Sequence, residues 1–263
     1  RPFNEIRTVM ERLKDAGLQE VVLTGIEISA WHDREYGYGL TDLLRVLDDL
    51  PSPRRIRLSS VDPLMFTDDF IETAAVSPKI AKSFHIPLQS ASDRVLAAMG
   101  RPYSVSYIRS LLDRLLRRIP DAGIGMDVIA GFPGEDAQCF KETRDFLVSV
   151  PIYYLHVFPF SSRPGTRAAS MEGAVREEEK KARVKELKLI DARKREVFHG
   201  RFVGSEAVII PEGKRYHGRY MRGYTGNYIP VHVPYDRTLE NRAVTVRIEQ
   251  VEKEMVIGSV TGE

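Results

Sequence analysis

The sequence predicts an α/β protein: an incomplete (β/α) barrel with about five parallel strands, followed by a small all-β domain. Apolar runs alternate with helical patterns through residues 1–199, which is typical of βαβ units and a parallel sheet. In residues 200–263 short β-type runs are separated by turns, a pattern compatible with an OB-like barrel. The apolar content of 43% and the charged content of 29% are ordinary for a soluble globular chain.

The periodicity of the apolar residues gives the expected elements in order. Strands are expected at 20–24, 55–59, 83–88, 123–130 and 153–160. Helices are expected at 4–16, 41–50, 67–76, 92–99, 104–118, 136–148 and 173–199. Asn4 and Thr41 are the predicted N-caps of the first two helices, because short polar side chains accept hydrogen bonds from the free amides there.

The second domain is expected to hold strands at 208–210, 228–233 and 243–248. Its segment 214–222 carries four basic residues, two tyrosines and no acid. Basic side chains bind phosphates and aromatic rings accept unstacked bases, so this pattern indicates RNA binding. The candidate RNA-binding residues in this domain are Lys214, Arg215, Tyr216, Arg219, Tyr220, Arg222 and Tyr224.

Composition excludes several classes of site. The single cysteine, Cys139, allows no internal disulfide and no self-contained cysteine-based metal site, so we expect no metal ligands in this chain. Packing is the expected role of Cys139, since no base lies near it in the sequence. No apolar run reaches membrane-spanning length, and we expect a cytoplasmic protein without membrane contact. The chain begins with Arg1, which suggests a fragment or a processed form.

Polar residues follow the predicted strands, where ligand sites of parallel sheets are found. Asp127 lies in an apolar strand and needs a partner there; it could accept hydrogen bonds from ribose hydroxyls, or serve a generic βα turn. The glycines of the turn at 131–134 let backbone approach a bound adenine. The candidate cofactor-binding residues are Glu27, Ser60, Asp62, Gln89, Arg101, Asp127, Gly131, Phe132, Pro133 and Gly134.

Each of these residues also has an ordinary structural explanation. Gln89 could be a turn residue, and His85 is expected to be structural. Arg101 could be a cation at a helix C-terminus or a clamp for a carboxylate. Arg163 could bind an anionic substrate group or form a salt bridge with a neighbour. The order of the motifs therefore matters more than any one residue.

Six motifs follow one another along the chain: Gly-Ile-Glu (25–27), Ser-Ser-Val-Asp-Pro (59–63), His-Ile-Pro-Leu-Gln-Ser-Ala-Ser (85–92), Met-Gly-Arg-Pro-Tyr (99–103), Asp-Val-Ile-Ala-Gly-Phe-Pro-Gly-Glu (127–135) and Phe-Ser-Ser-Arg-Pro-Gly-Thr (160–166). The series resembles the methylthiotransferases of the radical S-adenosylmethionine (radical SAM) superfamily over essentially the whole chain. The segment Gly-Tyr-Thr-Gly-Asn-Tyr (223–228) is similar to the RNA-binding TRAM module of that family.

Residues 156–166 indicate the subfamily. Their sequence, His-Val-Phe-Pro-Phe-Ser-Ser-Arg-Pro-Gly-Thr, looks most like the tRNA enzymes, above all the one acting on N6-threonylcarbamoyladenosine beside the anticodon. The isopentenyladenosine enzyme is the near alternative. The ribosomal-protein enzyme fits less well, because Ser90 stands where its histidine is usual.

The resemblance implies a transferase that adds a methylthio group to C2 of the modified adenosine in the tRNA anticodon stem-loop. Such enzymes use S-adenosylmethionine, two [4Fe-4S] clusters, an electron donor and a sulfur source. The family's cysteine-bearing N-terminal domain and Cys-x3-Cys-x2-Cys loop are absent here, and Arg1-Pro2 matches the point just past that loop. We therefore expect this chain to hold no catalytic residue and to be inactive alone.

The resemblance also assigns roles to the strand-tip residues. Gln89 and Asp127 would bind the ribose, with Ser60 or Asp62 assisting. Arg101 would take the methionine carboxylate and Glu27 the amine side, while residues 131–134 would frame the adenine.

Two other functions stay open on the residues alone. A metal-free β/α enzyme could use Glu27, Asp62 and Asp127 as general acid and base. A non-enzymatic RNA-binding protein could use the first domain only as a scaffold.

Overall fold

The computed structural model describes residues 1–253 and 255–262. Its first 160 residues contain five parallel strands, as the sequence predicted. Isolated bridges between Ile56 and Ile80 and between Ser60 and His85 join the pair β1-β2 to the sheet β3-β4-β5, so the strands follow each other in chain order. Their bounds are β1 Glu20–Leu23, β2 Arg55–Leu58, β3 Ser83–Gln89, β4 Gly123–Ala130 and β5 Tyr154–Pro159.

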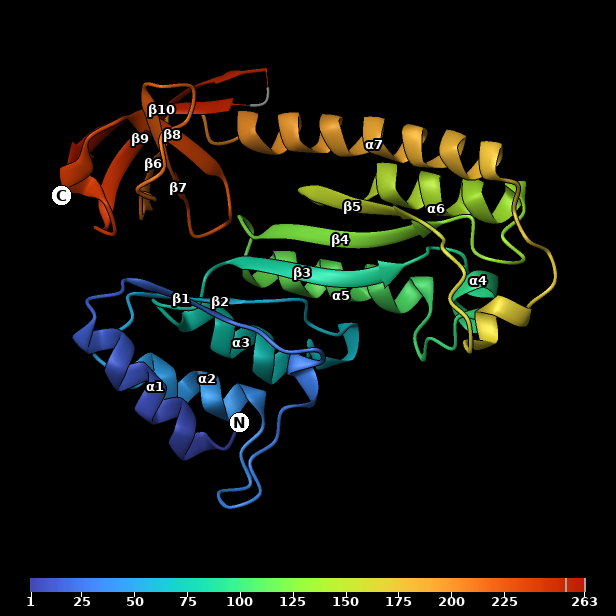
Figure 1. Ribbon diagram of the computed structural model, residues 1–263, viewed down its shortest axis with the longest axis horizontal. Coiled ribbons are helices and arrows are strands. Elements are labelled where there is room, and N and C mark those ends of the chain that lie inside the picture. Colours follow the sequence, from blue (N-terminus) through green and yellow to red (C-terminus); the bar gives the residue numbers. More distant parts are fainter. Residues whose placement is uncertain (254, 263) are drawn as a thin grey trace.

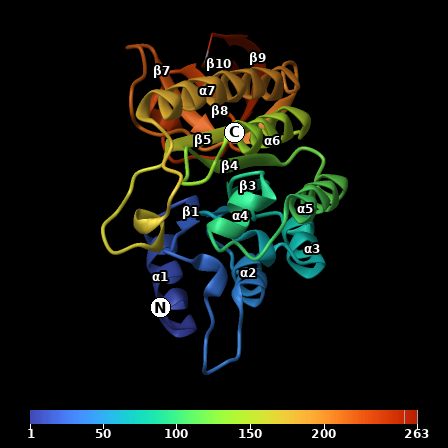
Figure 2. The ribbon, with the colours of Figure 1, turned by 90° about the vertical axis from the view of Figure 1, so that its right-hand side faces the viewer.

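Helices cover one face of this curved sheet. Figure 2 shows α2, α3, α5 and α6 following one another around it, and the long α7 lies beyond α6 along β5 (Figure 1). The connections are therefore the βαβ units expected from the alternating pattern. The helices are α1 Phe3–Asp15, α2 Leu40–Asp49, α3 Asp68–Val76, α4 Asp93–Ala98, α5 Val105–Arg118, α6 Ala137–Ser149 and α7 Glu177–Gly200, with short 3-10 turns at Ile28–Ala30, Pro63–Met65 and Arg167–Ser170.

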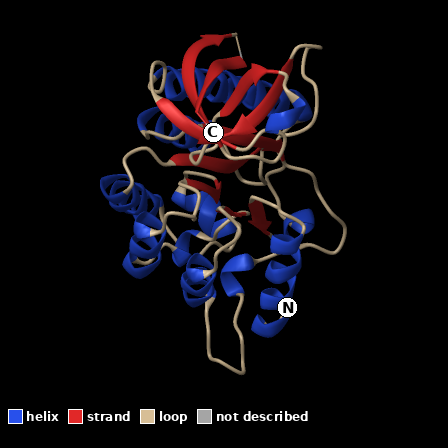
Figure 3. Ribbon diagram, turned by 90° about the vertical axis from the view of Figure 1, so that its left-hand side faces the viewer, coloured by secondary structure: helices blue, strands red, loops and turns tan. Residues whose placement is uncertain are grey.

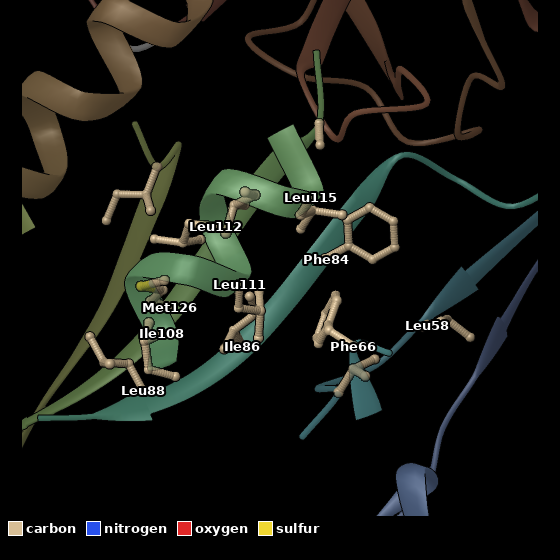
Figure 4. Close-up of a cluster of buried hydrophobic side chains, with 14 of the residues drawn as sticks. Leu58, Phe66, Phe84, Ile86, Leu88, Ile108, Leu111, Leu112, Leu115 and Met126 are labelled. Carbon is tan, nitrogen blue, oxygen red and sulfur yellow. The ribbon is translucent and has the colours of Figure 1, made fainter. Parts of the chain in front are cut away.

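The main core lies between the sheet and these helices. Alternate residues of β3 turn Phe84, Ile86 and Leu88 towards α5, because side chains alternate between the two faces of a strand. On α5 the apolar residues recur at helical spacing and meet them. Figure 4 shows this layer closing around Met126 of β4, and its members on α5 are Ile108, Leu111, Leu112 and Leu115.

Both predicted helix caps are wrong. Helix α1 begins at Phe3 with Pro2 in the N-cap position, which places Asn4 inside the first turn. Helix α2 begins at Leu40, and Asp42 accepts a hydrogen bond from the amide of Gly39 at 3.0 Å. In the second case an aspartate three residues inside the helix satisfies the N-terminal backbone, a role that the sequence analysis gave to Thr41.

The C-terminal domain is a five-stranded mixed sheet that curls on itself (Figure 3). Its order is β6-β9-β10-β8-β7, and a bridge between Pro211 and Gly223 brings β7 back to the chain just after β6. The sequence predicted three of these strands, β6, β8 and β9. Most of β7 lies in the basic segment 214–222, for which no strand was predicted, and none was predicted at β10. The bounds are β6 Glu206–Ile209, β7 Tyr220–Tyr224, β8 Pro230–Pro234, β9 Val244–Glu252 and β10 Met255–Gly262, with a 3-10 turn at Arg237–Leu239.

The C-terminal domain docks on the amino ends of the parallel strands. Arg55 donates hydrogen bonds to the carbonyl oxygens of Tyr224 and Val208 at 2.7 and 2.8 Å. Arg57 donates to the carbonyl of Thr225 at 2.8 Å, and Glu20 forms ion pairs with both arginines. These groups are largely buried, so they hold the two domains in one orientation. None of the described helices is long and apolar enough to cross a membrane.

Candidate functional site: the inner face and carboxyl tips of the strands

The face of the sheet opposite the helices carries polar side chains. On β3, β4 and β5 this face carries the side chains of His85, Asp127, Tyr154 and His156. The register places Asp127 directly beside His156 on the neighbouring strand. A parallel sheet thus brings together groups that are 71 residues apart in the chain, between positions 85 and 156.

Asp127 is held between two imidazoles. Its Oδ1 lies 2.8 Å from Nε2 of His85 and 3.4 Å from Nδ1 of His156. Nδ1 of His85 in turn lies 3.0 Å from the hydroxyl of Tyr154. The sequence required a partner for a carboxylate in an apolar strand, and these histidines supply it. His85, expected to be structural, therefore belongs to a polar cluster that also contains His156.

The surroundings of the cluster alter two pKa values. Burial lowers the pKa of His156, and the charge of His85 acts in the same direction. Burial raises the pKa of the Tyr154 hydroxyl well above its usual value. At neutral pH the cluster therefore holds a neutral His156 and a protonated Tyr154.

Gln89, at the carboxyl tip of β3, has an unusual backbone. Its φ is +68°, in the left-handed region that non-glycine residues rarely adopt, and the pairing of β3 with β4 is irregular between Ile86 and Gln89. Such strain is tolerated where surrounding structure imposes it, often at binding sites. Gln89 therefore ends β3 with a strained, left-handed backbone.

Arg101 lies beside a small cavity near the same tips. Its Nε is buried and has no hydrogen-bond partner among the described residues. The cavity, of about 230 Å³, is also lined by Phe132, by Ile129 of β4 and by Phe160 after β5. A buried guanidinium nitrogen without a partner is costly, so a ligand with an acceptor group would stabilise it.

Backbone groups of the turn at 131–134 form hydrogen bonds with the rest of the protein. The amide of Gly131 donates to Oε1 of Glu135 at 2.9 Å, and the amide of Gly134 donates to the carbonyl of Gly173 at 2.9 Å. Glu135 is buried and also forms an ion pair with Arg183 of α7. Burial raises the pKa of Glu135, while the hydrogen bonds from Gly131 and Arg183 oppose that shift. Two backbone donors of the turn are thus already used within the protein.

The other candidate cofactor-binding residues lie on loops at the same end of the sheet. Glu27 is exposed just before a 3-10 turn, and Ser60 is exposed beyond β2. Asp62 caps the next 3-10 turn by accepting from the amide of Leu64 at 2.8 Å. Pro133 is buried in the turn after β4. Of the candidate residues, Arg101 and Phe132 line the same small cavity.

Arg163 lies in the exposed loop after β5, where its carbonyl accepts a hydrogen bond from Thr166. No ion pair of Arg163 occurs within residues 1–253 and 255–262. A guanidinium on this loop is therefore accessible to an anionic group from solvent.

The basic segment forms an alternating layer of cations and rings. Arg215 lies over the ring of Tyr235 at 3.9 Å and Arg219 over that of Tyr220 at 4.9 Å. Lys214, Arg215 and Arg219 are exposed, and no carboxylate of the described residues lies within ion-pair distance of them. These three groups are free to bind phosphates.

Two of the candidate RNA-binding residues lie deeper in the domain. Arg222 is sandwiched between the rings of Tyr216 and Tyr224, at 4.5 and 4.8 Å, and forms an ion pair with Glu212. Tyr224 stacks on Tyr228 at the contact with the first domain. Their positions favour a supporting role in this layer.

With this geometry in hand, comparison with known proteins identifies the family. The family model described as "Radical SAM superfamily" matches residues 1–147, more than half of the chain. The chain belongs to the radical SAM superfamily. The curated relatives of this radical SAM chain include tRNA methylthiotransferases, which confirms the resemblance seen in the motif series.

Two kinds of relative are equally similar. Threonylcarbamoyladenosine tRNA methylthiotransferase MtaB of Bacillus subtilis is 35% identical over 94% of this chain and 56% of its own length. tRNA-2-methylthio-N(6)-dimethylallyladenosine synthase of Cronobacter sakazakii is 34% identical over 99% of this chain and 56% of its own. The chain therefore spans little more than half the length of the curated relatives it matches.

A solved structure supports the fold alone. The radical S-adenosylmethionine methyltransferase TsrM from Kitasatospora setae has a TM-score of 0.52 and 17% identity, covering 64% of this chain and 33% of that one. Together with the five parallel strands and the curled C-terminal sheet, this likeness confirms the predicted partial radical SAM barrel followed by a small all-β domain.

The residues of this radical SAM chain fit the two implied cofactors differently. The unpartnered Nε of Arg101 and the strained Gln89 fit a small polar ligand such as S-adenosylmethionine. A cysteine-ligated iron–sulfur cluster does not fit, because the only cysteine of the sequence is Cys139. It is buried on α6, where its sulfur accepts a hydrogen bond from Arg94 at 3.1 Å.

Proposed function

We propose that this chain forms the S-adenosylmethionine-binding and RNA-binding part of a tRNA methylthiotransferase acting on N6-threonylcarbamoyladenosine next to the anticodon. The observation that carries the proposal is the meeting of the family's motifs at one end of a parallel sheet. There Gln89 is held in a strained conformation and Arg101 has a buried nitrogen without a partner. The working place of such a protein would be the cytoplasm, where tRNA is modified.

In this proposal the strand tips bind the cofactor. Gln89 forms hydrogen bonds with the ribose hydroxyls, and Ser60 or Asp62 assists. Because Oδ1 of Asp127 contacts the two histidines, Oδ2 is the oxygen that binds the same ribose. Arg101 pairs with the methionine carboxylate, since a planar guanidinium suits that group. Glu27 faces the amine. The adenine lies along Phe132 and the remaining backbone groups of the turn at 131–134, including Pro133.

S-adenosylmethionine supplies the radical and the methyl group in such enzymes, and the protein supplies position. This chain's own residues orient that ligand. Because its sequence lacks the cysteines of both [4Fe-4S] clusters, we propose that it is catalytically incomplete alone. Electron and sulfur donors would serve the intact enzyme.

The RNA-binding residues lie in the C-terminal domain, residues 200–263. Lys214, Arg215 and Arg219 bind phosphates of the anticodon stem-loop, while Tyr216 and Tyr220 offer faces for bases. Arg163, at the other end of the sheet, would bind an anionic group of the tRNA near the modified base. An RNA that reaches both ends must span at least the length of β3, about 23 Å for seven residues at roughly 3.3 Å each.

The isopentenyladenosine enzyme is the second candidate, since relatives of that kind are as similar as the first. The threonylcarbamoyl group carries a carboxylate and the isopentenyl group does not. The exposed Arg163 beside the site therefore favours the first substrate.

Ligand-observed saturation-transfer NMR tests the cofactor part, because it detects weak binding without a cluster. Protons of the adenosine moiety should receive saturation from the wild-type chain. The signal should fall in the variants Gln89→Ala and Arg101→Gln. It should persist in Gln138→Ala and Arg45→Gln, which change the same residue types on the outer helices. An absent signal with the wild-type chain contradicts the proposal.

Salt-dependent binding of an anticodon stem-loop tests the RNA part. Replacing Lys214, Arg215 and Arg219 together by Ala should reduce the slope of log affinity against log salt by about 1 for each lost phosphate contact. The charge-matched control replaces Lys181, Lys185 and Lys188 of α7, which are also exposed. If the salt dependence decreases in the control and not in the first variant, the RNA does not bind at the basic segment.

A further inference from the structure

The polar cluster on the inner face of the sheet has the composition of a metal site. Two imidazoles and one carboxylate face one another there: one ring nitrogen of His85, one of His156 and a carboxylate oxygen of Asp127 all lie within 4.8 Å of one another. Two histidines with one carboxylate form a recurrent binding set for divalent transition metals, which leaves further coordination positions open. The expectation of no metal ligands followed from the single cysteine of the sequence.

The spacing of these atoms is close to what a metal requires. Ligand atoms about 2.0–2.1 Å from a tetrahedral zinc ion lie about 3.3 Å from each other. The two contacts of Asp127, at 2.8 and 3.4 Å, bracket that separation. The separations of Asp127 from the two imidazoles are therefore close to those between ligand atoms of a zinc site.

The surroundings of His85 also suit a ligand histidine. A histidine that binds metal through Nε2 must carry its proton on Nδ1, where a fixed acceptor holds the ring in place. The hydroxyl of Tyr154, 3.0 Å from Nδ1 of His85, is positioned to be that acceptor. Tyr154 is itself buried, and its ring stacks on that of His85 with an interplanar angle of 28°. This packing fixes the position of its hydroxyl.

We propose that His85, Asp127 and His156 form a binding site for one divalent transition-metal ion on the inner face of the sheet, with Tyr154 as the positioning residue behind His85. The side chain of His156 is 51% exposed. The remaining coordination positions thus face the open interior, where a ligand with oxygen or nitrogen donors could complete them. This site uses no cysteine.

Zinc binding to the chelator-treated chain tests the proposal. Equilibrium dialysis followed by elemental analysis should give one zinc ion per wild-type chain, and cobalt substitution should give visible d–d absorption. His156→Gln and Asp127→Asn remove ligands, and Tyr154→Phe removes only the hydroxyl that contacts Nδ1 of His85. Each should weaken zinc binding by at least about tenfold.

The control is His217→Asn, which removes an exposed histidine of the C-terminal domain; asparagine tolerates the left-handed backbone found there. Its zinc affinity should stay within about twofold of wild type. Circular dichroism confirms that each variant is folded. Failure of the folded wild-type chain to bind stoichiometric zinc overturns the proposal, and so does unchanged affinity in the folded His156→Gln variant. Neither result depends on S-adenosylmethionine or tRNA binding.

Discussion

At the scale of single residues, the turn after β4 shows why glycine is required at one position more than at another. Gly131 and Gly134 have nearly the same backbone, with φ of +82° and +83°. A Cβ on Gly131 would lie 2.2 Å from Cγ of Lys180, whereas one on Gly134 would meet nothing within 4 Å. The two positions therefore separate backbone strain from crowding against α7.

The pair Gly131→Ala and Gly134→Ala tests this distinction. Both variants lose about 1 kcal/mol in free energy of unfolding from the left-handed backbone. Gly131→Ala should lose about 1–3 kcal/mol more, because Lys180 and α7 must shift. Urea denaturation measures the difference. Equal losses in the two variants would show that α7 does not pack tightly on the turn.

The same scale shows what the sequence could and could not predict about the site. The need of Asp127 for a partner followed from its apolar neighbours alone. The identity of the partners did not, because His85 and His156 approach it only through the register of three strands, which local sequence does not encode. Likewise the burial of Glu135 against Arg183 depends on where α7 lies, 48 residues later in the chain.

At the scale of elements, α7 joins the two domains and ends in a buried histidine. The Nε2 of His199 lies 2.8 Å from the hydroxyl of Tyr153, just before β5. Burial lowers the pKa of His199 to about 4. Its neutral form is thus favoured in the folded state, while the unfolded chain titrates near its ordinary value of about 6.5.

This shift predicts a loss of stability in acid. Above pH 6.5 His199 is neutral in both the folded and the unfolded state, so its titration does not reduce the free energy of unfolding. As the pH falls from 6.5 to about 4, His199 binds a proton in the unfolded chain but not in the folded chain. The free energy of unfolding therefore decreases by roughly 3 kcal/mol. His199→Gln removes this titration. Denaturation at several pH values should therefore give a shallower acid decline for the variant, and identical pH profiles would contradict the assignment.

The elements themselves were predicted unevenly for a physical reason. The five parallel strands each carry buried apolar residues, and these short apolar runs are visible in the sequence. Strand β10 contains Gly258 and ends at Gly262, and β7 holds Arg222 and Gly223 among its five residues, so neither has a clear apolar pattern. Both exist because neighbouring strands of the curled sheet pair with them, which is tertiary context.

At the scale of the whole molecule, contacts between the two domains fix their relative orientation. The loop at 225–228 presses on the start of β4: a Cβ on Gly123 would lie 2.0 Å from the carbonyl oxygen of Asn227. Gly226, in the same loop, has nothing within 4 Å of such an atom. Arg55 and Arg57 complete the contact from β2.

Substitutions at these glycines test the coupling of the domains. Gly123→Ala should destabilise by about 1–3 kcal/mol through overpacking and should split thermal unfolding into two transitions. It should also speed proteolysis between α7 and β6. Gly226→Ala serves as the control and should unfold as wild type does. A single unchanged transition in both variants would mean that the domains do not depend on this contact.

We propose that the gene encoding this chain directs methylthiolation of a modified adenosine in tRNA. Nucleoside profiling of tRNA from a strain that lacks the gene tests it directly. We expect 2-methylthio-N6-threonylcarbamoyladenosine to disappear while its precursor without the methylthio group accumulates and the isopentenyl series is unchanged. A profile in which every methylthiolated adenosine persists at its normal level would contradict the claim.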